Sequence, residues 1–557
     1  MPRRLCRVRV LIFHGYLLQG TGSNVYNANL AEALVRLGHE VHLLCQERAP
    51  EALPFVDAVG DWDGGELALR TLREPVRCTV YRPALAGLLP VYVADRYDGI
   101  EARPYPDCSD EEVEAYVAAN VRAVRDVLTR ARPDAALANH LVMGPLVLAR
   151  ALDETVPYAV KVHGSDIEYT VAPHPERFVP PSLEGMASAR TALVGSQHIA
   201  ERLYATLRDP SLPARTRLGP PGVDVARFAP REPAAARAGL HDLAGHLADA
   251  AAKRGGAAPA AGEQRSAFAR DEGEAAAALA DVVRGVEATA EVDRPVTARE
   301  DRLVAFVGKL IVSKGVDLLV AAWPLVLQRE PRARLVLVGF GAYRDGIERL
   351  IGALADGPDG VPALDALVSA GRGAEGGPVA PLRHLRAFLD GLGADELERY
   401  RHAARGLRER IVLTGRLDHD ELVDLLPACE ALIVPSTFPE AFGMVAAEGA
   451  ACGALPICAD HSGLAEVAGT LAEAVPAPAR GWLAFPVDKE GAEPVRAIAE
   501  RVIAWLEAPA PLREQTRAAL VATVRERWSW EGVARGVIAA ATADAQGPAA
   551  SIDEVRR

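Results

Sequence analysis

Short apolar runs alternate with amphipathic stretches from the start of the chain. Val8–Phe13 predicts a buried strand and Gly20–Asn24 a Gly-rich loop. Val25–Leu37 has apolar residues at helical spacing and predicts a helix, for which Gly38 is a natural end. Val41–Cys45 predicts the next strand. A strand, a helix and a strand in this order indicate a parallel sheet covered by helices.

The same alternation recurs in both halves of the chain. Further strands are predicted at Asp134–Ala138, Tyr158–Val162, Thr191–Gly195, Leu303–Val307, Arg334–Val338, Ile411–Thr414 and Ala431–Val434. The pattern predicts an α/β fold with two Rossmann-like, doubly wound domains that face a central cleft. Ligands of such domains bind at the carboxyl ends of the strands.

Changes of composition suggest where the domains begin and end. We expect an N-terminal Rossmann-like domain over 1–230, an Ala/Gly-rich insertion or linker over 231–299, a C-terminal Rossmann-like domain over 300–490 with an insertion near 352–408, C-terminal helices over 491–545, and a tail over 546–557. Within the first insertion, Ala248–Gly262 is expected to be flexible or marginally helical.

Composition narrows the class of protein. The 557 residues suggest two or three domains, and 50% apolar with 25% charged residues fits a soluble globular chain. The net charge of −13 argues against nucleic acid as a partner. No Cys-x-x-Cys pair occurs among the seven cysteines, so neither a zinc nor a redox motif is indicated, and a reducing, cytoplasmic location is expected. No apolar run reaches the roughly 18 residues of a membrane-spanning helix.

The most informative feature is a pair of glutamates, Glu440 and Glu448, with seven residues between them, behind the apolar run Ala431–Pro435. We expect the first on a loop and the second in the first turns of a helix. Carboxylates suit sugar and ribose hydroxyls, and the free amides of a helix start suit a diphosphate. Gly443 between them lets the backbone approach a ligand closely. The alternative, two solvated helix carboxylates, fits the apolar and Gly-rich flanks less well.

Two lysines and a glycine loop supply possible anion contacts. Lys309 and Lys314 follow the strand Leu303–Val307, where cations suit a diphosphate, although lone surface lysines are common. Gly20 and Gly22 lie between the first strand and its helix, where a phosphate or a sugar could approach. Neither a complete dinucleotide fingerprint nor a phosphate-binding P-loop is present.

Polar residues also follow two strands of the first half. His163 and Asp166 come after Tyr158–Val162 and fit a reacting centre. A structural histidine and a helix-capping aspartate explain them equally well. His140, at another strand end, is weaker evidence, and no metal-binding spacing is evident.

Together these segments resemble the retaining glycosyltransferases of family 4, which have the GT-B fold. The resemblance runs in the family's order through Gly20–Val41, His163–Asp166, Gly222–Asp224 with Phe228, Gly308–Gly315, Leu335–Gly341 and Thr414–Val467. The E-x7-E segment is its most specific part. The chain departs from the family at Lys309, where arginine is frequent, and at Thr21-Gly22, where the family has paired glycines.

The resemblance implies roles for the matching residues. Glu440 would hold the donor sugar, Glu448 the ribose, and Lys314 the diphosphate, while His163 would lie near the reacting carbon. The expected catalytic residues are therefore His163, Glu440 and Lys314. The expected donor-binding residues are Gly22, Lys309, Lys314, Phe442, Gly443, Met444, Val445 and Glu448. The acceptor side is expected to include Gly20, His140 and Asp166.

The sequence thus predicts metal-independent transfer of a sugar from a nucleotide-diphosphate sugar, with retention of configuration and without a cofactor. The N-terminal domain would bind a carbohydrate, lipid or small-molecule acceptor, and the C-terminal domain would bind the donor. A lipid acceptor would bring the protein to a membrane surface. Two alternatives stay open: a sugar-nucleotide 2-epimerase of the same fold type, and a non-catalytic sugar-nucleotide-binding protein. A nicotinamide oxidoreductase is a more distant alternative.

Overall fold

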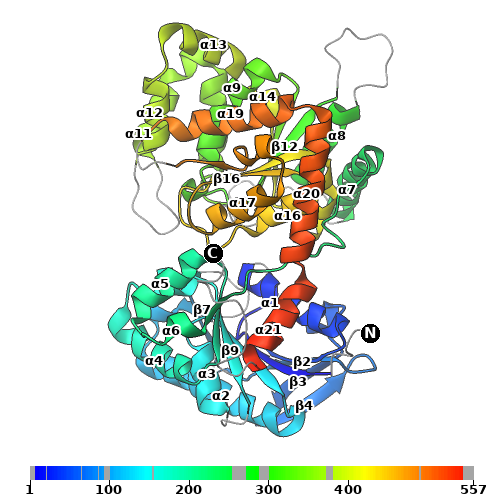
Figure 1. Cartoon of the computed structure of the whole chain (residues 1–557), viewed down its shortest axis with the longest axis vertical. Helices are drawn as coiled ribbons and strands as arrows, with labels where there is room; N and C mark the ends of the chain where they lie inside the picture. The colour runs from blue at the N-terminus through cyan, green and yellow to red at the C-terminus, as the bar shows by residue number, and fades with distance from the viewer. Residues whose placement is uncertain are drawn as a thin grey trace. The chain divides into compact units, whose positions relative to one another are not determined.

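The chain folds into two compact units, and its last part returns to the first of them. The computed structural model describes residues 7–19, 22–63, 65–85, 87–92, 101–152, 156–253, 271–287, 300–371, 381–487 and 491–542. One unit comprises Met1–Gly222 together with Trp528–Arg557, and the other comprises Val223–Arg527 (Figure 1).

The first unit is built on a nine-stranded sheet in the order β11-β10-β9-β8-β1-β2-β5-β3-β4. Its strands are β1 (Arg9–Phe13), β2 (Glu40–Leu44), β3 (Ala58–Asp63), β4 (Glu66–Thr71), β5 (Cys78–Arg82), β8 (Ala135–Asn139), β9 (Tyr158–Val162), β10 (Thr191–Val194) and β11 (Thr216–Leu218). Apart from the antiparallel pair β3–β4, neighbouring strands run parallel. Strands β6 (Leu88–Val91) and β7 (Glu101–Pro104) pair separately.

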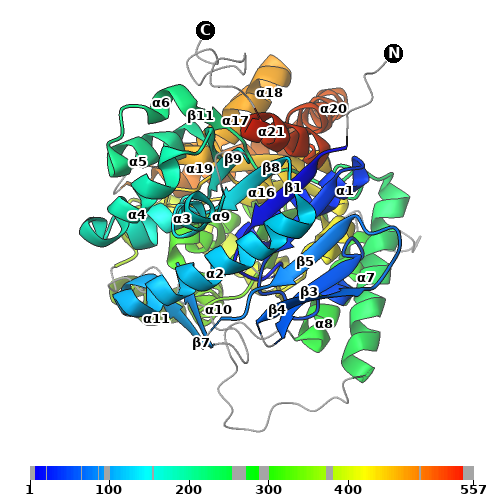
Figure 2. The ribbon, with the colours of Figure 1, turned by 90° about the horizontal axis from the view of Figure 1, so that it is seen from below.

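Helices cover this sheet. On one face α1 (Gly22–Arg36) packs beside the final helix α21 (Trp530–Thr542), which also contacts β8, β9 and β10. On the other lie α2 (Asp110–Ala131) and α3 (Gly144–Ala151), as Figure 2 shows for α2. The remaining helices are α4 (Pro175–Ala187), α5 (Gln197–Leu207) and α6 (Leu212–Arg215), with a π-helical turn at Ile167–Val171.

The second unit holds a six-stranded, fully parallel sheet in the order β14-β13-β12-β15-β16-β17. Its strands are β12 (Arg302–Val307), β13 (Ala333–Val338), β14 (Ile411–Gly415), β15 (Cys429–Val434), β16 (Leu455–Ala459) and β17 (Ala484–Phe485). Counted from β12, this is the 3-2-1-4-5-6 order of doubly wound nucleotide-binding domains. The strand order reverses between β12 and β15, where such domains bind their ligands.

The helices of this unit fall into three groups. The sheet is flanked by α9 (Val316–Arg329), α10 (Arg344–Ala355), α16 (Met444–Ala451), α17 (Ser462–Ala474), α19 (Glu493–Glu507) and α20 (Ala510–Arg527). Short helices are α14 (Leu407–Arg410), α15 (Leu422–Leu425) and α18 (Ala477–Arg480). The two expected insertions supply α7 (Pro233–Lys253), α8 (Glu272–Glu287), α11 (Val361–Ala370), α12 (Arg383–Asp390) and α13 (Ala394–Ala404).

The first insertion is more ordered than the sequence suggested. Helices α7 and α8 pack on each other, and α8 packs on β14, the edge strand of the second sheet. Arg334 of β13 pairs with Asp281 of α8, which ties the insertion to the sheet. Residues 248–253 of the expected linker are helical, and the rest of that linker lies outside the described residues.

Three boundaries differ from those expected from the sequence. The first unit ends at Gly222 instead of residue 230. Helix α1 begins at Gly22, three residues before the predicted start at Val25. The C-terminal helices are divided between the units. Helix α20 ends at Arg527 in the second unit, and α21 belongs to the first unit. Among the described residues no helix is long and apolar enough to cross a bilayer.

Candidate functional site

The loops that follow β12 and β15 are fastened together at the point where the second sheet reverses. The backbone N–H of Thr437 donates to the Ser313 carbonyl at 2.9 Å. Gly315 has φ +64° and leaves no room for a side chain, because a Cβ would collide with the carbonyl oxygen of Pro435. The two loops therefore hold their polar residues in a fixed relation, Lys314 on one and Glu440 on the other.

Both the side chain and the backbone of Glu440 make hydrogen bonds in these loops. Its carboxylate accepts from Lys314 Nζ and, at 2.6 Å, from Ser436 Oγ, while its backbone N–H donates to Ser462 Oγ at 2.9 Å. Burial alone would raise the pKa of Glu440, but the charge and hydrogen bond of Lys314 and the hydrogen bond of Ser436 together lower it, and the pKa lies below its usual value. Glu440 is thus an ionised, acceptor-only group.

Gly443 precedes α16 and opens the start of that helix. Its φ is +108°, and a Cβ there would come within 2.5 Å of Leu464 Cδ2, so glycine is required on both grounds. Met444 and Val445, in the first turn, are half-buried, and Phe442 is buried. The first amides of a helix have no partner within it, so this turn presents donors suited to an anion.

Glu448 lies one turn further along α16 and is almost fully buried. Its side chain is 3% exposed, and its Oε1 atom accepts from His419 Nε2 at 2.8 Å. Burial lowers the pKa of His419, but the charge and hydrogen bond of Glu448 together with the charge of Asp420 raise it, and the net shift is upward. The two carboxylates of the motif therefore have different partners, a lysine for Glu440 and a histidine for Glu448.

The other two residues predicted to bind the sugar-nucleotide donor, Lys309 and Gly22, lie in different units. Lys309 follows β12 in the second unit and is exposed. Gly22 is the first residue of α1 in the first unit, with no atom within 4 Å of a Cβ built there. Packing therefore does not require glycine at position 22, which is compatible with a role in ligand approach. Gly20, expected on the acceptor side, lies outside the described residues.

In the first unit, polar residues gather where that sheet reverses, between β1 and β8. His163 Nε2 lies 3.0 Å from Asn139 Oδ1, and Asn139 Nδ2 donates to Asn27 Oδ1 at 2.7 Å. Asn27 Nδ2 lies 3.0 Å from His14 Nδ1. Burial lowers the pKa of His163 well below its usual range, and burial lowers that of His14 to about 4. His163 is therefore a neutral imidazole at the end of a buried hydrogen-bonded chain.

His140 lies beside this chain without joining it. Its ring is 4.7 Å from that of His163 and 4.2 Å from that of Tyr92, and the residue is 1% exposed. Neither of its nitrogens has a hydrogen-bond partner among the described residues. Burial lowers its pKa well below the usual range. Its place on the acceptor side stays a prediction.

The carboxylate of Asp166 is hydrogen-bonded to backbone N–H groups. It accepts from the N–H groups of Leu141, Gly164 and Ile167. Burial raises the pKa of Asp166. The capping role considered from the sequence therefore accounts for these contacts, and an acceptor-side role remains a prediction.

Sequence reasoning missed several residues that complete the arrangement. They are His14, Asn139, His419, Ser436, His461 and Ser462. His14 and Asn139 follow or end a predicted strand, which was a usable signal. His419 and His461 carried none, because their contacts with Glu448 and with the Ser436 carbonyl join distant parts of the chain.

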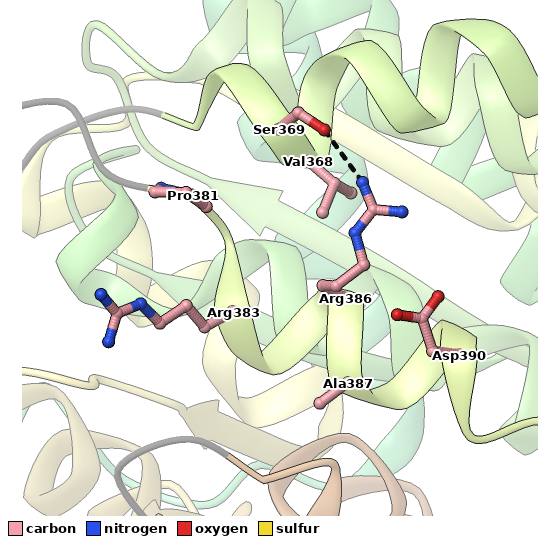
Figure 3. A pocket seen from close by; sticks show the side chains of 7 residues that line it. All are labelled: Val368, Ser369, Pro381, Arg383, Arg386, Ala387 and Asp390. Carbon is pink, nitrogen blue, oxygen red and sulfur yellow. Dashed lines mark hydrogen bonds between the residues drawn. The ribbon is translucent and has the colours of Figure 1, made fainter.

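A groove of about 650 Å³ lies elsewhere in the second unit, between α11 and α12 (Figure 3). It is lined by Val368, Ser369, Pro381, Arg383, Arg386, Ala387 and Asp390. Arg386 is held by Asp365 at 2.7 Å and by Ser369 at 2.9 Å. The groove contains none of the residues predicted for the site. In the described part of the chain no cluster of His, Cys, Asp and Glu residues could hold a metal ion.

Two family models match the chain, one in each half. A "Glycosyl transferase 4-like domain" matches residues 21–222, and "Glycosyl transferases group 1" matches residues 386–521. The second match includes the whole segment from His419 to Ser462. The two matches thus fall on the two units that the structure separates.

Among curated proteins, similarity is limited to part of the chain. An uncharacterized glycosyltransferase of Methanocaldococcus jannaschii is 24% identical over 168 residues, 30% of this chain and 30% of that protein. The mannosylfructose-phosphate synthase of Agrobacterium fabrum is 25% identical over 178 residues, 32% of this chain and 30% of that protein. The aligned region therefore spans less than a third of these relatives.

Solved structures resemble the whole fold at low sequence identity. The catalytic domain of starch synthase IV from Arabidopsis thaliana, bound to ADP and acarbose, is 14% identical, covers 96% of this chain and 99% of its own, and has a TM-score of 0.52. HepE of Anabaena, in complex with UDP and glucose, is also 14% identical, covers 96% and 98%, and has a TM-score of 0.50. With the two parallel sheets and both family models, this places the chain in the GT-B glycosyltransferase superfamily.

Proposed function

We propose that this protein transfers a sugar from a nucleotide-diphosphate sugar to an acceptor hydroxyl, with retention of configuration and without a metal ion. The observation that carries the proposal is the set of groups at the reversal point of the second sheet. In sequence order these groups are a lysine, Lys314, an ionised glutamate, Glu440, an open helix start, Gly443–Val445, and a buried glutamate, Glu448.

Each group suits one part of such a donor. The ionised Glu440 is an acceptor for sugar hydroxyls, and Glu448 for ribose hydroxyls. Lys314 has three N–H groups, and Glu440 takes one, so others are available to diphosphate oxygens. The amides of Met444 and Val445 add donors of the same kind.

Departure of the nucleoside diphosphate is the step that these groups would assist. When the bond from the sugar carbon to the diphosphate oxygen breaks, the negative charge of the leaving group grows. A fixed ammonium and oriented amides stabilise that charge without reorganising, which is the main source of electrostatic catalysis. Retention would follow from attack of the acceptor oxygen on the face that the diphosphate leaves, as the resemblance to family 4 implies.

The names of similar proteins agree with this assignment. Mannosylfructose-phosphate synthase is a sugar-transferring enzyme by its name, and the HepE and starch synthase IV structures contain UDP and ADP. For this chain we propose a nucleoside diphosphate donor of the same class, with acceptor binding in the first unit. The catalytic role of His163 stays a prediction.

The test begins with binding. Thermal unfolding of the wild-type protein is followed with UDP, ADP, GDP and dTDP and their glucose and mannose derivatives. A ligand that binds only the folded state at about 100 times its Kd adds about 2.7 kcal/mol of stability. We expect one nucleotide series to raise the melting temperature, and Glu448→Ala to lose most of that rise. Glu473→Ala, an exposed glutamate on α17, is the matched control and should keep it.

Product analysis then separates the alternatives. With the donor that binds, a transferase releases nucleoside diphosphate in step with a glycosylated acceptor, whereas a 2-epimerase returns an altered sugar nucleotide without an acceptor. A non-catalytic binding protein would leave the donor intact with every acceptor tried. Failure of the whole nucleotide panel to stabilise the wild-type protein would contradict the proposed function.

A further inference from the structure

The hydrogen bond between His419 and Glu448 joins the turn after β14 to the middle of α16. Glu448 is 3% exposed, and its bond from His419 uses Oε1, one of two carboxylate oxygens. A buried carboxylate is costly unless it is paired and hydrogen-bonded. His419 therefore supplies both a donor and, when protonated, a compensating charge to the residue proposed to hold the ribose.

His419 is itself held in place from two sides. The Phe228 ring lies over it, with ring centroids 5.0 Å apart. The turn that carries it is closed by a reciprocal capping box between Asp418 and Glu421. Arg227 pairs with Asp420 at 2.7 Å, which fastens the segment bearing Phe228 to the same turn. The imidazole is half-buried, and these contacts limit its freedom to turn away from Glu448.

The charged groups around His419 come from three elements. Glu448 lies on α16, Asp420 on the turn of His419, and Arg227 on the segment that follows the first unit. The two carboxylates raise the pKa of His419, whereas burial and Arg227 lower it, and the net shift is upward. Asp418 and Glu421 of the capping box and the Arg231–Asp424 pair lie further along the same two segments.

From this geometry we infer that His419 is a positioning residue for the nucleotide. It fixes Glu448 through Oε1, leaves Oε2 for a ribose hydroxyl, and neutralises the buried carboxylate so that an anionic ligand can bind beside it. The inference rests on the proposed function, because it assigns a partner to the ribose-binding carboxylate.

The inference has a definite pH dependence. Below the pKa of His419 the pair is neutral overall. As the pH rises through that pKa, the imidazole loses its proton and Glu448 becomes an uncompensated anion, which repels a nucleoside diphosphate. Nucleotide affinity should therefore fall with rising pH, on the alkaline side of the usual histidine range because the shift is upward.

The experiment is calorimetric titration with UDP, ADP, GDP and dTDP between pH 6.5 and pH 9. His419→Ala removes the donor and should weaken the nucleotide that binds wild-type protein by about 10- to 100-fold at pH 7, the range for a hydrogen bond to a charged group. His419→Gln keeps an N–H donor without a titrating charge. It should bind within about threefold of wild type at high pH, where the wild-type imidazole has also become neutral, and show a flatter pH profile. The ratio of wild type to variant at each pH cancels titration of the ligand.

His241→Gln is the matched control, since His241 is an exposed histidine beside a carboxylate, Asp242, and should change nothing. Unchanged affinity in His419→Ala, with loss in Glu448→Ala, would overturn the inference and leave the proposed function standing. A pH profile of His419→Gln that parallels the wild type would overturn it as well. No binding of any nucleotide by wild-type protein would contradict the proposed function itself. If His419→Ala does not fold, the glutamine variant still gives the pH readout.

Discussion

At the scale of single residues, Lys314 and Glu440 keep each other ready for a ligand. The lysine keeps the buried glutamate ionised, as the lowered pKa of Glu440 records, and the glutamate keeps the ammonium at the end of η4 (Val312–Lys314). Each partner is therefore oriented before any donor arrives. Such preorganisation is where electrostatic catalysis gains most, because no group has to move as charge develops.

Replacing Lys314 should slow transfer more than it weakens donor binding. Lys314→Ala removes the cation that faces the leaving group, and we expect kcat to fall by about 10² or more. Lys314→Arg keeps a cation and should lose less. Steady-state kinetics with saturating donor measures the effect, with the exposed Lys253→Ala as the control. Turnover of Lys314→Ala near that of the wild type would rule out its role at the leaving group.

Lys161, on β9 in the first unit, gives a separate test through stability. Its side chain is 2% exposed, Nζ donates to the Gly219 carbonyl at 2.5 Å, and burial lowers its pKa to about 7. The unfolded chain has the usual value near 10.4, so above about pH 7 unfolding takes up a proton. The folded state is therefore favoured increasingly as the pH rises.

Between pH 7 and pH 9 the stability of the wild-type protein relative to Lys161→Met should rise by up to about 1.4 kcal/mol per pH unit. Chemical denaturation at pH 7, 8 and 9 measures this difference. The hydrogen bond lost in the variant contributes equally at every pH, so only the slope matters. Lys253→Met, which alters an exposed lysine, should show no slope, and parallel curves for Lys161→Met and the wild type would refute the expectation.

At the scale of elements, α21 is a core helix of a unit whose other elements all lie in the segment that ends at Gly222. Trp530, Ala534, Val537 and Ala541 are buried in the same apolar cluster as residues of β1 and β2. Gly222, the last residue of the first segment, packs so closely on Trp530 that a Cβ would come within 2.5 Å of the indole. The Tyr26 ring contacts both Trp530 and His163, with centroids 5.3 and 5.2 Å away. Helix α21 thus packs on Tyr26, the ring that contacts His163.

Trp530→Ala should therefore destabilise the first unit. The indole is 2% exposed, and truncation of a buried Trp to Ala costs about 3–5 kcal/mol. Differential scanning calorimetry should show the transition of that unit at lower temperature and the other transition unchanged. Trp482→Ala in the second unit is the reciprocal control. Equal displacement of both transitions by Trp530→Ala would contradict the assignment of α21 to the first unit.

The elements that the sequence predicted are those with local signals. Buried parallel strands are short apolar runs, and β9 was predicted with the bounds that it has, Tyr158–Val162, because Pro157 precedes this run and Gly164 follows it closely. The unit in which a helix packs cannot be predicted from the sequence of that helix alone. The C-terminal helices were expected as one group over 491–545, and the packing of Trp530 on Tyr26 of α1 and on Gly222 assigns α21 to the first unit while α20 stays in the second.

At the scale of the whole molecule, the repeated strand–helix pattern predicted two parallel sheets with their sites at the carboxyl ends of strands. The strand order of the second sheet puts the loops of Lys314 and Glu440 beside each other at its reversal point. The motif thus located both carboxylates, whereas the partner of Glu448 could not be predicted, since 29 residues separate it from His419. Pairing over such a distance depends on how β14 and α16 pack relative to each other, and no local sequence pattern indicates this.

The return of α21 to the first unit also bears on how the protein is made. A ribosome releases the chain from its N-terminus, so residues up to Gly222 leave the exit tunnel well before Trp530 exists. Until translation nears its end, the nascent first unit exposes the apolar surface of α1, β8 and β9 that α21 later covers. The unit that begins first is completed last. A premature stop codon between α20 and α21 would therefore yield a chain whose second unit is complete and whose first unit lacks the helix that closes its core.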